Sequence, residues 1–385
     1  MRTSLFNTIS MGIRRANIDW LLVAAIIPLL GAGLVTMHSF VGTSDYFFEK
    51  QMMWIAVSFA AFLALTMLDV RFLRRTYVIM LLYGGIVFVL LLLLIIGQAT
   101  QGAVSWFSFS GFSIQPSDPA KIVAILLLAK YFSRRHIEIA NIRHIIVSGL
   151  YIFILFALVF LQPDFGSAII IASIWLGMIM VSGISKKHLI LVVALAVTAF
   201  AGMWGFVFED YQKQRIMTFL NPLTDIQGSG YHAYQSTIAV GSGEVFGKGV
   251  GFGTQSRLSF LPEYETDFVF AAFAEEWGFI GVAILFAIFL FVVWRILVNA
   301  MRGATNFETL FGAGLAILFM SHFVVHVGMN IGLLPVTGTT IPFISYGGSH
   351  LLTEFVGLGL LMSMRRYSRP VHREDVTREL AEMST

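Results

Sequence analysis

The sequence has no cysteine and little charge, and both absences restrict what the chain can be. Without cysteine in 385 residues, structural disulfides, thiolate zinc sites and a cysteine nucleophile are excluded. Only 12% of the residues are charged and 57% are hydrophobic, which is too apolar for soluble domains with a solvated surface. We therefore expect most of the surface to face lipid and any chemistry to use oxygen and nitrogen groups.

Long apolar runs are the most abundant feature of the sequence. A helix needs about 20 residues to cross roughly 30 Å of hydrocarbon. A shorter run follows Ser117-Asp118-Pro119, which is a helix-opening signal. The sequence predicts an all-α integral membrane protein with about ten transmembrane helices, near 20–38, 51–68, 76–97, 119–133, 143–161, 167–183, 188–208, 269–294, 308–331 and 349–364.

Lysine and arginine are distributed unevenly among the segments between these runs. Alternate segments hold 19 of the 25 basic residues, so the positive-inside rule places them, and both termini, in the cytoplasm. This predicts a cytoplasmic amino terminus (1–18), a single ten-helix membrane domain (19–367) and a cytoplasmic tail (368–385). The segment 209–266, between the seventh and eighth helices, then forms a large extracytoplasmic loop.

This long outer loop is rich in charged residues and glycine. Six glycines lie between residues 241 and 253. A loop of this length in a compact protein is usually functional or disordered, and so many glycines suggest tight turns or close approach of the backbone to a ligand. We expect an ordered functional loop, with a flexible surface loop as the alternative.

A series of short motifs runs in a fixed order from about residue 102 to 348. In this order the motifs resemble the SEDS (shape, elongation, division and sporulation) family. The short amino terminus is more similar to the rod-shape branch (RodA) than to the division branch (FtsW), which is a close second. The motifs include Gly230-Tyr231-His232, Gly241-Ser242-Gly243, Gly247-Lys248-Gly249, Thr266-Asp267-Phe268, Glu275-Glu276-Trp277-Gly278, Met329-Asn330-Ile331-Gly332 and Pro342-Phe343-Ile344-Ser345-Tyr346.

The resemblance implies an activity and a set of partners. The activity is that of an inverting peptidoglycan glycosyltransferase, which polymerises lipid II into glycan strands on the outer face of the bacterial cytoplasmic membrane, for elongation or division. The implied partners are lipid II (the undecaprenyl-pyrophosphate-linked disaccharide-pentapeptide), a class B penicillin-binding transpeptidase and membrane lipid, with no nucleic acid.

Such a reaction needs a carboxylate that accepts the proton of the attacking hydroxyl. Asp267 lies where the long loop meets the eighth predicted helix, and it matches the family's essential aspartate, so we predict that it is catalytic. A helix-starting acid stabilised by the helix dipole is the alternative. Glu263 is predicted to orient the sugar, share a proton with Asp267 or hold a divalent cation.

Positive groups are needed to stabilise the charge that grows on the departing pyrophosphate. Arg215 is the first candidate because a guanidinium binds phosphate oxygens bidentately, and Lys248 is the second. A solvated loop charge is the alternative for each. Lys121 lies three residues after Asp118, so the two are predicted to pair. The resemblance makes Lys121 functional and places both residues at the substrate site, with snorkelling as the alternative for the lysine.

Two uncharged segments complete the predicted site. Trp106 matches a family tryptophan and is predicted to stack on a sugar, with interfacial anchoring as the alternative. Ser345 lies in a segment rich in glycine and proline that suits a re-entrant turn, and it is predicted to line the site. No metal-ligand spacing rises above noise, so no cofactor is assigned, and a bound divalent cation (Mg²⁺ or Mn²⁺) stays open.

Several polar residues in apolar surroundings can be interpreted either as part of the site or as structural. Glu275 and Glu276 either line the cavity or hold the bundle together. His322 and His326 share a helical face, which more often means packed hydrogen bonds than metal binding. Asp164 is either a capping residue or part of the site.

The chain departs from the family pattern at several motif positions. Ser105 stands where an arginine is common, Asp118 where a glutamate is common, and His350 where a small residue is common. The missing arginine removes a phosphate contact if it served as one. Either Arg215 and Lys248 then suffice for that role, or the activity is low without a partner protein.

A lipid II flippase or other transporter is the main alternative function, because ten helices and buried charges suit transport as well. A transport site usually lies near the midplane, between inverted repeats, and no internal repeat is visible here. A non-catalytic scaffold would leave Asp267 and Glu263 without a purpose. The concentration of polar residues in an outer loop favours interfacial chemistry.

Overall fold

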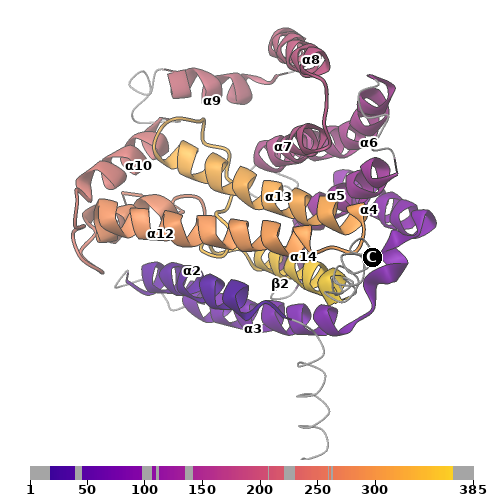
Figure 1. Cartoon of the computed structure of the whole chain (residues 1–385). Coiled ribbons are helices and arrows are strands. Elements are labelled where there is room, and N and C mark those ends of the chain that lie inside the picture. Colours follow the sequence, from indigo (N-terminus) through magenta and orange to yellow (C-terminus); the bar gives the residue numbers. More distant parts are fainter. Residues whose placement is uncertain are drawn as a thin grey trace, which may run out of the picture.

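The computed structural model is a bundle of long helices that lie roughly side by side (Figure 1). It describes residues 18–39, 46–97, 106–109, 112–134, 142–206, 208–220, 230–258, 260–261 and 263–366. The predicted all-α class is confirmed, and each predicted helix is present. These helices are α2 (Trp20–His38), α3 (Tyr46–Met67), α4 (Thr76–Ile96), α5 (Ser117–Ser133), α6 (Ile142–Leu161), α7 (Phe165–Val181), α8 (Lys186–Phe206), α12 (Val269–Met301), α13 (Asn306–Asn330) and α14 (Gly348–Arg366).

Seven helices in the described part of the chain are long and apolar enough to cross a membrane, namely α2, α3, α4, α6, α8, α12 and α13. Helix α7 is apolar but has only 17 residues, and α5 also has 17. This is a multi-pass membrane protein. Which helix ends face the cytoplasm, and the division into a single membrane domain with two cytoplasmic tails, remain predictions.

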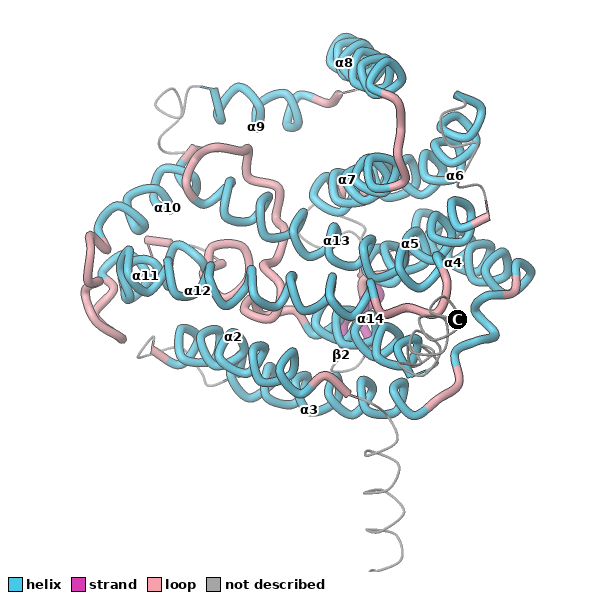
Figure 2. Tube along the Cα trace, in the orientation of Figure 1, coloured by secondary structure: helices cyan, strands magenta, loops and turns pink. Residues whose placement is uncertain are grey.

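Short elements occupy the connections between the long helices. A 3-10 helix, η1 (Val70–Arg74), follows α3, and an antiparallel hairpin of β1 (Phe107–Phe109) and β2 (Phe112–Ile114) precedes α5. The hairpin was not predicted from the sequence. The long loop contains α9 (Asp210–Leu220), α10 (Tyr231–Ser242) and α11 (Thr254–Arg257), so it is ordered as predicted where it is described (Figure 2).

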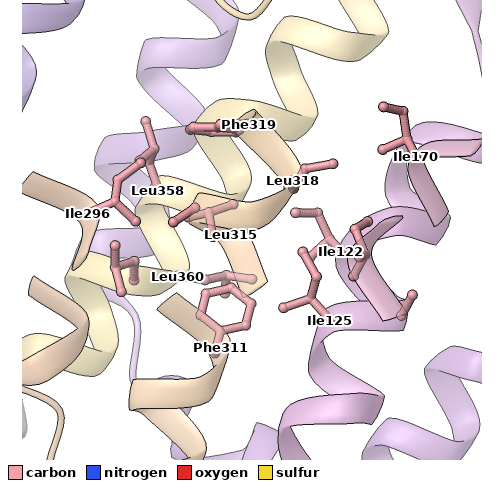
Figure 3. Packing of buried hydrophobic residues seen from close by; sticks show 14 of the residues in the cluster. Ile122, Ile125, Ile170, Ile296, Phe311, Leu315, Leu318, Phe319, Leu358 and Leu360 are labelled. Atoms are coloured by element: carbon pink, nitrogen blue, oxygen red, sulfur yellow. The ribbon is translucent and has the colours of Figure 1, made fainter. Parts of the chain in front are cut away.

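The centre of the bundle is formed by α5, α13 and α14, which bury most of their side chains. Figure 3 shows Ile122 of α5 facing Leu315 and Leu318 of α13, with Leu358 of α14 on the other side. Helix α13 packs tightly on α5, because a Cβ at Gly314 would lie only 2.6 Å from the Ile125 side chain. In contrast, α8 buries none of its side chains and stands apart from the bundle (Figure 1).

Helix α12 is broken at Gly278, a feature that the sequence analysis did not predict. The φ and ψ angles of Gly278 are 63° and −169°, a conformation that is essentially restricted to glycine. The break frees backbone groups, and the loop after α10 satisfies them. The amides of Lys248 and Gly249 donate to the carbonyls of Glu275 and Glu276, each at 3.0 Å. The glycines of this loop therefore allow one backbone to enter a gap in another.

Candidate active site

Asp267 lies in a tight turn at the start of α12. The carbonyl of Glu263 accepts hydrogen bonds from the amides of Thr266 and Asp267, at 3.2 and 3.0 Å. Glu263 itself has a φ of 45°, in the left-handed region, and its side chain is exposed. Asp267 is half-buried, and burial raises the pKa of the neighbouring Glu265 carboxyl above its ordinary value. The turn therefore brings the predicted base and the predicted orienting acid into one short segment.

Two buried side chains hold this turn against the bundle. The Ser345 hydroxyl donates to the carbonyl of Thr266 at 2.8 Å, and Asn330 Nδ2 donates to the carbonyl of Asp267 at 3.0 Å. Gly338 comes so close that a Cβ there would lie 3.4 Å from Asp267 Oδ2. The backbone at Gly338 thus lies beside the Asp267 carboxylate. The predicted substrate contact of Ser345 stays a prediction, because its recorded contacts position the turn.

A second polar cluster lies at the start of α5. The Lys121 amine is 3.0 Å from Asp118 Oδ1, and both side chains are almost completely buried, which confirms the predicted pairing. Ser349 donates to Asp118 Oδ2 at 3.0 Å. A buried lysine is costly unless it is paired, so the buried Lys121 requires the Asp118 carboxylate beside it.

His350 joins this cluster to α14. Its Nδ1 lies 3.4 Å from Asp118 Oδ1, and its Nε2 lies 2.9 Å from Glu354 Oε1. The other oxygen of Glu354 accepts the amide of Phe343 at 3.1 Å. The His350 ring also contacts the ring of His322, with centroids 4.5 Å apart. The departure from the family at position 350 therefore adds a titratable group between two buried acids.

One short segment, residues 345–350, links the two clusters. Ser345 contacts the turn that carries Asp267, and Ser349 and His350 contact Asp118. Asp118 and Asp267 were both predicted to lie at the substrate site, but their sequence positions do not show how they are connected. In the structure residues 345–350, which lead into the first turn of α14, are the connection.

Lys248 is held differently from what its predicted role requires. Its amine lies 2.8 Å from Glu275 Oε1 and 2.9 Å from Thr254 Oγ1. Glu275 is completely buried and also accepts the amide of Gln255 at 3.1 Å. Lys248 therefore compensates a buried acid, and binding of the pyrophosphate by this lysine stays a prediction that its geometry does not favour.

The remaining polar residues have structural contacts. Glu276 accepts the Gly251 amide at 2.8 Å and the Ser39 hydroxyl at 2.7 Å, and Glu275 accepts the Lys248 amine at 2.8 Å. Both acids therefore hold the loop after α10, and Glu276 also holds the end of α2. His322 and His326 contact the carbonyls of Thr340 and Thr339, at 3.1 and 2.6 Å, as expected for packed histidines.

Asp164 caps α7 by accepting the amide of Ser167 at 3.0 Å, and it also accepts Gln115 Nε2 at 2.7 Å. This confirms the capping interpretation of Asp164. Because Gln115 lies between β2 and α5, its contact with Asp164 also ties the start of α5 to α7.

Other predicted residues are placed only in part. Trp106 is half-buried immediately before β1, and Arg215 lies on α9, where its side chain is outside the described residues, as is the whole of Ser105. Among the described residues, no group of three or more histidine, aspartate or glutamate side chains is arranged to hold a metal ion. A divalent cation at the site stays open.

Sequence reasoning missed the roles of Asn330 and Ser349. Asn330 is fully buried; besides Asp267 it contacts the amide of Ala271 through Oδ1 at 3.2 Å. The signal for Asn330 was its place in the motif Met329-Asn330-Ile331-Gly332, but a motif does not say what its side chain contacts. For Glu354, an acid in an apolar helix, the two interpretations were lining the cavity and holding the bundle together, and its contacts with the Phe343 amide and His350 fit the second.

The arrangement is that of a polytopic membrane protein with an acidic turn at one end of its bundle and a buried lysine-carboxylate cluster beside it. A family model described as "Cell cycle protein", covering FtsW, RodA and SpoVE, matches residues 16–370. The chain belongs to this family, so the resemblance seen in the sequence is confirmed.

Characterised relatives agree with this assignment. The peptidoglycan glycosyltransferase MrdB of Escherichia coli is 38% identical over 273 residues, which cover 71% of this chain and 74% of that protein. The stage V sporulation protein E of Bacillus subtilis is 33% identical over 374 residues, which cover 93% of this chain and 100% of that protein.

Solved structures have the same fold. The rod shape determining protein RodA of Thermus thermophilus matches with a TM-score of 0.69 and 27% identity, over 91% of this chain and 98% of that one. A chain from a peptidoglycan synthase complex that coordinates polymerization and crosslinking matches with a TM-score of 0.78 and 28% identity, over 91% and 99%.

Proposed function

We propose that this chain is a peptidoglycan glycosyltransferase that polymerises lipid II at the outer face of the bacterial cytoplasmic membrane. The observation that carries the proposal is the fixed position of Asp267, whose turn is held by Ser345 and Asn330 at one end of a membrane bundle. The names of the relatives support it, because MrdB is a peptidoglycan glycosyltransferase.

In this mechanism the Asp267 carboxylate accepts the proton of the 4-hydroxyl of one lipid-linked disaccharide. That oxygen forms a bond to the anomeric carbon of a second molecule, and the bond from this carbon to the pyrophosphate oxygen breaks with inversion. Glu263, in the same turn, orients the attacking sugar. Arg215 binds the departing pyrophosphate, because charge developing on a leaving group is stabilised by a fixed cation.

The Asp118–Lys121 pair takes part by shaping the substrate site beside the Asp267 turn. The pair is buried and charge-compensated, and residues 345–350 connect it to that turn. Trp106, just before the hairpin that leads into α5, stacks on a sugar ring. These residues orient the substrate, and Asp267 carries out the proton transfer.

A class B penicillin-binding transpeptidase is the proposed protein partner, because glycan strands must be crosslinked after they are polymerised. The structural match to a chain of a peptidoglycan synthase complex supports an assembly of this kind. The proposed topology places the 209–266 loop and Asp267 outside the membrane, where lipid II is polymerised.

The broken helix does not favour transport over catalysis. The break at Gly278 leaves 23 residues from Phe279 to Met301, which extend roughly 34 Å and suffice to cross the hydrocarbon. The break therefore lies toward one end of the span, whereas a transport site is expected near the midplane.

The direct test incubates the purified chain in nanodiscs with lipid II, with and without a purified class B transpeptidase, and separates glycan strands by length. We expect strands that depend on the chain and become more abundant with the partner. The same preparation in sealed vesicles, assayed for lipid II translocation, addresses the alternative. Translocation without any strand formation would replace the glycosyltransferase proposal by a transporter.

A further inference from the structure

Helix α2 is fixed to α12 at both of its ends. At one end Asp19 Oδ2 accepts Arg295 Nε at 3.0 Å and Asn299 Nδ2 at 2.6 Å. At the other end the Ser39 hydroxyl donates to Glu276 at 2.7 Å. The two helices lie side by side in between (Figure 1). The 19 residues of α2 extend roughly 28 Å, close to the thickness of the hydrocarbon core. The contacts at the two ends of α2 therefore mark the two edges of the hydrocarbon core.

The break in α12 lies at one of these edges. Gly278 follows Glu276 by two residues, so it is level with the end of α2. The 23 residues after the break suffice to cross the membrane alone, as argued above. Two independent helices, α2 and the second part of α12, therefore place the edge of the hydrocarbon at Gly278.

The loop after α10 is attached at this same level by its backbone. The amides of Phe279 and Ile280 donate to the carbonyls of Glu244 and Val245, at 2.9 and 3.1 Å. The amide of Gly251 donates to Glu276 at 2.8 Å. These bonds fix the height of the loop relative to the membrane edge.

Apolar side chains of this loop point outward at that height. In the loop, Phe246 is 81% exposed and Phe252 is 67% exposed, and Phe279, directly after the break in α12, is 69% exposed. With three further exposed apolar residues they make up a set of six that we call the apolar collar: Val245, Phe246, Val250, Phe252, Phe279 and Ile280. Lys248, which lies among them in sequence, is turned toward Glu275.

We propose that the apolar collar inserts into the interfacial region of the lipid bilayer and anchors the outer loop to the membrane surface. Lipid is the occupant because the collar lies at the edge of the hydrocarbon and continues into the lipid-facing surface of α12, where Ile284 and Phe291 are exposed. Aromatic side chains favour this region of a membrane. An exposed apolar patch on a loop can also mark a contact with another protein, and accessibility to oxygen distinguishes lipid from protein around the collar.

Anchoring has a consequence for catalysis that rests on the proposed function. Asp267 lies in the turn just before Val269, and the part of α12 from Val269 to the break at Gly278 extends roughly 14 Å. The collar therefore holds the carboxylate at a constant height above the hydrocarbon, which suits a sugar tethered to the membrane through a pyrophosphate.

The test uses the absence of native cysteine. The full chain with Phe246→Cys, Phe252→Cys or Val250→Cys is labelled with a nitroxide and reconstituted in nanodiscs of phosphatidylethanolamine and phosphatidylglycerol. Thr237→Cys, on the exposed side of α10, is the matched control. Collisions with oxygen, which concentrates in lipid, are compared with collisions with a water-soluble nickel chelate.

We expect oxygen to dominate at the three collar positions and nickel to dominate at position 237, with ratios that differ several-fold. Dominant nickel collisions at the collar would mean that the loop projects into water, and the proposal would be wrong. Exclusion of both reagents would mean that protein covers the collar, which also overturns it. Lipid II is not used, so failure of the glycosyltransferase proposal leaves this result unaffected.

Discussion

Lys121 and Lys248 are both lysines with a carboxylate partner, but their surroundings give them different roles. Lys121 is buried beside Asp118 in the cluster that is connected to the Asp267 turn. Lys248 is partly exposed and compensates Glu275, which is completely buried at the break of α12. The two residues are therefore expected to fail in different ways when they are replaced.

Asp267→Asn is expected to lower the rate of polymerisation by about 10² to 10⁴, because an amide of nearly the same shape cannot accept the proton. Glycan strand formation from lipid II measures the effect. Asp210→Asn, at an exposed aspartate in the first turn of α9, makes the same chemical change and should leave the rate unchanged. A rate for Asp267→Asn within about threefold of the parent would exclude it as the general base.

Lys248→Met should destabilise the fold by about 2–3 kcal/mol, because it leaves the buried Glu275 carboxylate without its cation. The thermal midpoint in detergent measures this loss. The double variant Lys248→Met/Glu275→Gln removes both charges and should recover much of it. Lost polymerisation by Lys248→Met with an unchanged midpoint would instead support a direct contact with pyrophosphate.

Arg215→Ala should slow polymerisation by about tenfold or more, because it removes the cation proposed for the leaving group. Arg257→Ala is the matched control, since Arg257 lies exposed at the end of α11. Equal and small effects of the two changes on strand formation would remove Arg215 from the site.

At the scale of elements, the broken helix α12 and the loop after α10 depend on each other. The break leaves carbonyls and amides that the helix cannot satisfy, and the loop supplies partners for them. In return, the helix gives the glycine-rich loop one fixed conformation. Neither element has its observed structure without the other.

Gly278→Ala tests this dependence. A Cβ at Gly278 would lie 2.2 Å from the amide nitrogen of Gly247, in a backbone conformation restricted to glycine. We expect a loss of at least about 2–3 kcal/mol in the free energy of unfolding, seen as a lower thermal midpoint. Gly84→Ala in α4 has open space around its Cβ and should change stability by less than about 1 kcal/mol. Similar midpoints for both variants would contradict the steric argument.

At the scale of the whole molecule, the proposed chemistry depends on which side of the membrane the long loop occupies. The excess of lysine and arginine in alternate segments predicts that this loop lies outside. The bundle itself is compatible with either orientation, because its helices pack in the same way whichever end faces the cytoplasm.

Cysteine labelling in intact cells decides this orientation. With no native cysteine as background, Thr237→Cys on α10 should react with a membrane-impermeant thiol reagent, once any outer membrane is permeabilised. Ser185→Cys, between α7 and α8, should react only after the cytoplasmic membrane is opened. The reverse pattern would place Asp267 on the cytoplasmic side, and the glycosyltransferase proposal would have to be given up.

The sequence by itself determined the helical elements, because their signals are local. The apolar run 20–38 coincides with α2, and α5 begins at Ser117, although Pro116 is its N-cap and the Ser117 hydroxyl donates to Asp164 instead of capping the helix. The Asp118–Lys121 pair was predictable for the same reason, since three residues of helix bring two side chains to one face. Hydrophobic runs, caps and helical spacing need no knowledge of the rest of the chain.

Only the tertiary structure decided which distant groups meet. His350 reaches Asp118 across 232 positions of sequence, and Ser345 reaches the turn before Asp267 across 79. Lys248 meets Glu275 because a helix breaks and a loop enters the gap. Such contacts depend on how helices pack, and packing depends on side-chain shape over the whole bundle, which no local periodicity records.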